Sequence, residues 1–166
     1  MVAAGLTQGG FFRHFRSKGQ LVAEANVAAF GQLMEMFERA IVGKPPREAL
    51  DTIVSLYLHQ LQGKDPAYLC PLANLGSELR HADEQVKATT VDCYERLVRL
   101  VAEQTQQLGI AGHADVANAI VSTLVGAVTL SRLAPDPGTE ETILLNTQKR
   151  RSRSIAVFAT SKCPST

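Results

Sequence analysis

The feature that most constrains the fold is the spacing of apolar residues, which recurs every three or four positions in each long segment. This spacing places apolar side chains on one face of an α-helix, whereas a half-buried strand would require alternation with a period of two. Glycine and proline interrupt the pattern, as in Gly43-Lys-Pro-Pro46 and Gly63-Lys-Asp-Pro66. The sequence therefore predicts an all-α fold of amphipathic helices joined by short breaks.

Capping signals place the helix ends. Ser17 and Gln20 have the spacing of a capping box at the start of a long helix, which Gly43 ends. Pro46 suits the first turn of the next helix, and Asp136 with Pro137 suits the start of the last one. Two short helices are expected at about residues 8–15 and 69–79, and long ones after Asp83, at about 114–134, and up to about residue 159. The 114–134 segment is apolar around most of its circumference, so we expect other surfaces to cover it on several sides.

Composition narrows the class of protein. The chain has 166 residues, 45% of them hydrophobic, which is enough to bury a core, and its formal net charge of +1 means that binding to nucleic acid would need a local basic patch. Cys70, Cys93 and Cys163 form no CxxC pair, which indicates a reducing cytoplasm and neither a disulfide framework nor a metal site. Because we find no signal peptide, and polar residues interrupt every apolar run, we expect no membrane association.

Known catalytic motifs are missing from the sequence. It contains no GxSxG elbow, P-loop, HExxH pair or dinucleotide-binding fingerprint. We therefore expect a protein that is not an enzyme and that needs no cofactor.

The most specific motif covers residues 4–21, Ala-Gly-Leu-Thr-Gln-Gly-Gly-Phe-Phe-Arg-His-Phe-Arg-Ser-Lys-Gly-Gln-Leu. It resembles the second half of the helix-turn-helix in the TetR family of transcriptional regulators. The resemblance is carried by Gly5, His14, Phe15, Lys18 and Leu21 at their spacing. It implies a recognition helix that lies in the DNA major groove, followed by a connecting helix.

The motif divides the candidate DNA contacts into two groups. Thr7, Gln8 and Gly9 occupy the turn that would face base edges, where a glutamine can pair with adenine through two hydrogen bonds. The remaining candidates would contact or flank phosphates; these are Phe12, Arg13, His14 and Lys18. Family members commonly carry tyrosine at the position of Phe12, so one phosphate hydrogen bond is expected to be lost here.

The family pattern also places one helix and most of a second before the position of Val2. These helices support the recognition helix, so we expect residues 1–166 alone to bind DNA poorly. The resemblance implies a partial DNA-binding headpiece with its connecting helix (1–42), a ligand-binding and dimerisation domain (43–160) and a flexible tail (161–166).

What the resemblance implies for function is a ligand-responsive regulator, a repressor that a small apolar effector releases from operator DNA. The alternative is a helical ligand-binding or dimerisation module that acts without DNA. The expected pocket combines apolar walls with a few polar groups; its lining residues would be Phe30, Met34, Tyr57, Leu61, Tyr68, Cys70, Asn74, Glu78, Tyr94, Val121 and Val125.

A homodimer is expected through the last two helices, which would form a four-helix bundle across a two-fold axis. The expected interface residues are Ile120, Thr123, Leu124, Ala127 and Leu130 on the first helix, and Leu144, Thr147, Arg151, Ile155 and Phe158 on the second.

Simpler roles compete with several of these assignments. Aromatic side chains and Met34 at helical spacing are more often core residues than ligand contacts. Cys70 and Cys93 fit small buried apolar residues better than redox sensors. Glu78 fits a solvated or paired carboxylate, and the basic segment 149–153 fits a solvated helix face.

Overall fold

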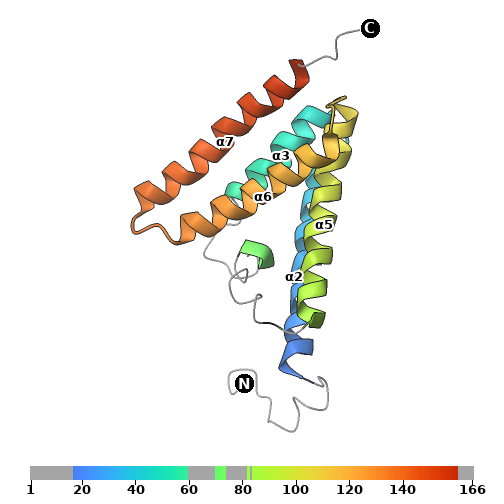
Figure 1. Ribbon diagram of the computed structural model, residues 1–166, viewed down its shortest axis with the longest axis vertical. Helices are drawn as coiled ribbons and strands as arrows, with labels where there is room; N and C mark the ends of the chain where they lie inside the picture. The colour runs from blue at the N-terminus through green and yellow to red at the C-terminus, as the bar shows by residue number, and fades with distance from the viewer. Residues whose placement is uncertain (1–16, 60–69, 74–81, 83, 161–166) are drawn as a thin grey trace.

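A computed structural model of the chain describes residues 17–59, 70–73, 82 and 84–160, and its long elements within these ranges are helices (Figure 1). They are α2 (Lys18–Ile41), α3 (Pro46–His59), α5 (Glu84–Gln107), α6 (His113–Arg132) and α7 (Pro137–Thr160); residues 71–73 are also helical. The predicted all-α fold is confirmed. The ends of α6 and the end of α7 lie within two residues of the expected positions.

The predicted start and stop signals of the helices lie at the expected places. The Ser17 hydroxyl accepts a hydrogen bond from the Gln20 amide at 3.0 Å, which caps α2, while the Gln20 side chain donates to Glu24 at 2.8 Å. Past the end of α2, Gly43 has a φ of +72°, and Gly109, with a φ of +68°, follows α5. Glycine suits these two positions because other residues rarely adopt positive φ.

Helix α7 begins with a well-formed cap. The carboxylate of Asp136 accepts hydrogen bonds from the Thr139 amide at 2.9 Å and from the Thr139 hydroxyl at 2.8 Å. These bonds lower the pKa of Asp136 from its ordinary value of 3.8. The expected cap and first-turn pair, Asp136 with Pro137, is therefore confirmed.

A pH-dependent contribution of this cap to stability is expected. Because the folded-state pKa of Asp136 is lowered, its contribution is complete above the unfolded pKa and is lost as the pH falls through the folded pKa. We expect Asp136→Ala to lower the thermal midpoint at pH 7, and the difference from the wild type to shrink as the pH falls below 3.8. Circular dichroism melts between pH 7 and pH 2.5 measure this. Asp136→Asn, which keeps an accepting oxygen, serves as control, and a constant difference at all pH values would contradict the assignment.

The helices pack around one main core. Helices α2 and α5 lie side by side with their amino ends together, α3 contacts α2, α5 and α6, and α7 packs along α6 (Figure 1). The largest completely buried side chains come from α2, α3, α5 and α7; they include Phe30, Phe37, Leu50, Ile53, Tyr57, Leu58, Leu97 and Leu144. The first turn of α2 is formed by residues 18–21, the end of the motif, so α2 connects that motif to the core.

Helix α6 is the one described helix long and apolar enough to cross a membrane by length and composition. Core helices meet the same criterion, and α6 buries Ala117, Val121, Leu124 and Val128 against the rest of the chain. One face of α6 therefore belongs to the protein core.

Candidate functional site

The residues predicted to line a pocket meet in the main core. Phe30, Tyr57, Cys70 and Val121 have no exposed surface, and Met34 is 3% exposed. Val125 and Tyr94 are partly buried and pack against the same cluster. Leu61, Tyr68, Asn74 and Glu78 lie outside the described residues. The sequence thus identified side chains that the fold brings together from α2, α3, α5 and α6.

A tyrosine–cysteine pair occupies the centre of this cluster. The Tyr57 hydroxyl donates a hydrogen bond to the Cys70 sulfur at 3.0 Å, and the Tyr57 ring stacks on Phe37 with ring centroids 6.3 Å apart. Burial raises the pKa of Tyr57 well above its ordinary value and also raises the pKa of the Cys70 thiol. Both groups are therefore neutral at physiological pH. Cys70 and Cys93 are both buried, as expected for small apolar residues.

Arg132, at the end of α6, acts electrostatically on the same pair. Its positive charge lowers the pKa of Tyr57 and the pKa of Cys70, and so opposes the effect of burial. In each case this effect of Arg132 is the smallest of the contributions. The sequence alone predicts no role for Arg132. The signal that could have identified it is the position of a charged residue in the last turn of a helix that is otherwise mostly apolar.

Tyr94 also joins two helices through its hydroxyl group. Its hydroxyl bonds to the side chain of Asn118 and to the Ser122 hydroxyl, the latter at 2.8 Å. Asn118 and Ser122 lie on the exposed surface of α6. The Tyr94 hydroxyl therefore fixes α5 against α6 near the surface and is not directed into the core, although its ring packs on the cluster.

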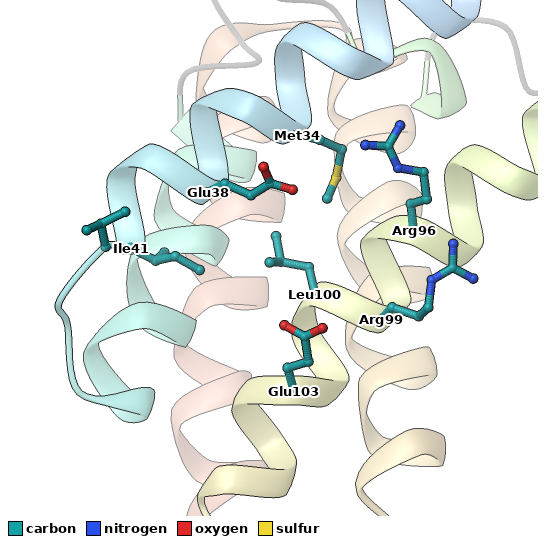
Figure 2. Close-up of a pocket in the computed structure, with 8 residues that line it drawn as sticks. Met34, Glu38, Ile41, Arg96, Arg99, Leu100 and Glu103 are labelled. Atoms are coloured by element: carbon teal, nitrogen blue, oxygen red, sulfur yellow. The ribbon is translucent and has the colours of Figure 1, made fainter.

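A surface groove of about 510 Å³ runs between α2 and α5 (Figure 2). Met34 and Leu100 lie at its centre, and Arg96 and Arg99 project from α5. Glu38 of α2 and Glu103 of α5 contribute carboxylates to the lining. Met34 is the one predicted pocket residue in its lining. Charges of both signs surround this groove, so it does not have the apolar walls expected for the effector pocket.

Comparison with known proteins identifies the family. Residues 46–139, more than half of the chain, match the C-terminal domain of LmrA/YxaF-like transcriptional regulators, a TetR-family domain. The chain belongs to the TetR family. No curated protein sequence matches the chain.

In this TetR-family chain, the residues predicted for the dimer interface fall into four groups. Leu124, Ala127 and Leu144 are at most 5% exposed and belong to the core of the single chain, which corrects their assignment to the dimer interface. Thr123 and Leu130 are exposed, whereas Ile120 and Thr147 are half-buried. The side chains of Arg151, Ile155 and Phe158 lie outside the described residues.

The exposed surface of α6 overlaps the predicted interface only in part, because Thr123 and Leu130 belong to both. Ala119, Thr123, Gly126 and Leu130 follow one another at helical spacing and are exposed or partly exposed. Leu133, which follows α6, and Leu145, on α7, are further exposed leucines, with exposed fractions of 75% and 37%. We call the surface formed by these six residues the α6–α7 face.

The predicted DNA contacts of the family lie largely outside the structure. Thr7, Gln8, Gly9, Phe12, Arg13 and His14 lie outside the described residues, and Lys18 is the first residue of α2, its side chain likewise undescribed. The structure describes the helix that continues from them.

Proposed function

We propose that this protein is a ligand-responsive DNA-binding repressor that acts as a cytoplasmic homodimer and is released from its operator by a small apolar effector. The observation that carries the proposal is the family match over residues 46–139 in a chain whose α2 begins within a helix-turn-helix-like motif. The family match supports a regulatory ligand-binding domain, and the motif supports DNA as its target.

The connection between the main core and the helix-turn-helix-like motif supports regulation by a ligand. Helix α2 places Phe30, Met34 and Phe37 in the main core and packs against α3 and α5. A ligand that binds this core better in one position of α2 than in another would shift the population of α2 positions. Because residues 18–21 belong both to α2 and to the motif, the headpiece would move with it.

Binding to operator DNA tests this proposal. We expect DNA from the region upstream of its own gene to bind with an affinity that falls steeply with salt, measured by fluorescence anisotropy. Gln8→Ala is expected to weaken binding by about 5- to 150-fold by loss of a base contact, and Lys18→Ala to reduce the salt dependence by about one phosphate contact. Both residues 1–166 and the same chain preceded by any in-frame upstream codons should be measured.

The control for these variants is Lys149→Ala, which removes an exposed lysine from α7 and should leave DNA binding unchanged. If neither form of the chain binds DNA, the proposal is wrong, and the chain acts as a ligand-binding or dimerisation module without DNA.

A further inference from the structure

One buried polar group has no hydrogen-bond partner within the described part of the chain. Asn26 lies on the inner face of α2 and is 6% exposed, and its side-chain nitrogen Nδ2 is buried without an acceptor. Its neighbours on the same face of the helix, Ala23 and Phe30, are buried and apolar. A buried N–H group without a partner is unfavourable, and native structures contain few of them, so Asn26 requires an explanation.

Asn26 lies at a break in the apolar packing. Phe30, one turn further along α2, belongs to the main core, whereas Ala23, one turn earlier, packs with Val86 of α5 in a separate small cluster. The amide is therefore located where α2 leaves the main core and approaches the headpiece motif. Apolar side chains flank it along the helix, so an acceptor for its N–H is not supplied by these neighbours.

We propose that Asn26 donates a hydrogen bond to the effector, and that the effector is a neutral apolar molecule with an acceptor oxygen such as a carbonyl. This inference rests on the proposed function in assuming an effector, but it concerns binding alone. A neutral molecule fits because the described neighbours Ala23 and Phe30 are apolar and would oppose the entry of a charge. The location on α2 gives the hydrogen bond a direct effect on the helix that leads to the motif.

Two probes of nearly equal shape isolate the hydrogen bond. Acetophenone carries a carbonyl oxygen, and ethylbenzene has a methylene group in its place. We expect the wild-type chain to bind acetophenone at least about fivefold more tightly than ethylbenzene, as one net hydrogen bond allows. Asn26→Leu is expected to abolish this preference, and Asn146→Leu, at an exposed position on α7, to retain it. Ligand-detected nuclear magnetic resonance measures the affinities.

Thermal unfolding without ligand separates this role from a structural one. Because Asn26→Leu removes an unpaired donor, the variant should melt at the wild-type temperature or above it; Asn26→Ala is the second variant if leucine does not fit. A lower midpoint with an unchanged preference for acetophenone, equal affinities of the wild type for the two probes, or no binding of acetophenone would overturn the proposal. Failure of DNA binding would leave this result intact, since the measurement requires no DNA.

Discussion

Replacing Phe37 by alanine is expected to lower the free energy of unfolding by about 3–5 kcal/mol. Phe37 has no exposed surface, and its ring stacks on Tyr57 with an interplanar angle of 20°. The substitution removes packing between α2 and α3 beside the Tyr57–Cys70 pair and leaves a cavity that the surrounding helices fill only in part. Urea denaturation followed by circular dichroism at a fixed protein concentration measures the change.

Two further variants separate core packing from a general effect of mutation. Phe37→Leu should destabilise the chain less than alanine does, because most of the buried volume remains. Val42→Ala, at the end of α2 where the side chain is 79% exposed, should change the free energy of unfolding by at most about 0.5 kcal/mol. A loss below about 1 kcal/mol for Phe37→Ala would show that this part of the core is not packed as described.

Replacing Leu130 by arginine is expected to raise the dissociation constant of the proposed homodimer by at least about 30-fold, which is the effect of losing a residue central to an interface. Leu130 is 57% exposed, although it belongs to a helix that is mostly apolar. With Leu133 and Leu145 it forms the apolar part of the α6–α7 face. A second copy of the same face, related by a two-fold axis, would cover these leucines. Sedimentation velocity across a concentration series measures the dissociation constant.

Val42→Arg is the matched control for this prediction. Val42 is also an exposed apolar residue, but it follows α2 and lies outside the α6–α7 face, so the variant should dimerise as the wild type does. A wild-type chain that is monomeric at all concentrations, or a Leu130→Arg chain that dimerises normally, would contradict the proposed interface. Circular dichroism confirms that each variant is folded.

The helices were predictable because their signals are local. The period of the apolar residues, the cap at Ser17, and the proline and glycine signals at Pro46 and Gly109 act through backbone geometry within a few positions. The same holds for the cap at Asp136. The buried face of α2 follows the same period, but periodicity gives no information on whether a buried amide such as that of Asn26 finds a partner.

The faces of α6 were less predictable because this helix is apolar on most sides. One position along a helix corresponds to a rotation of about 100°, so a stripe that starts at Ile120 faces a different direction from one that starts at Ala119. The prediction placed Leu124 and Ala127 on the dimer surface, but they pack against the core of the single chain. On α7, Leu144 is buried and Leu145 is exposed, again one position from the prediction.

The sequence by itself determined the all-α class, the helix ends and the family resemblance, since each depends on residues close together in the chain. Only the tertiary structure decided which sides of α6 and α7 are buried, that Tyr57 bonds to Cys70, and that Tyr94 joins α5 to α6. These features depend on residues far apart in the sequence, and helices of similar apolar character can pack in several rotations. Packing of the whole chain selects one of these rotations, because it must fill the core and pair the buried polar groups together.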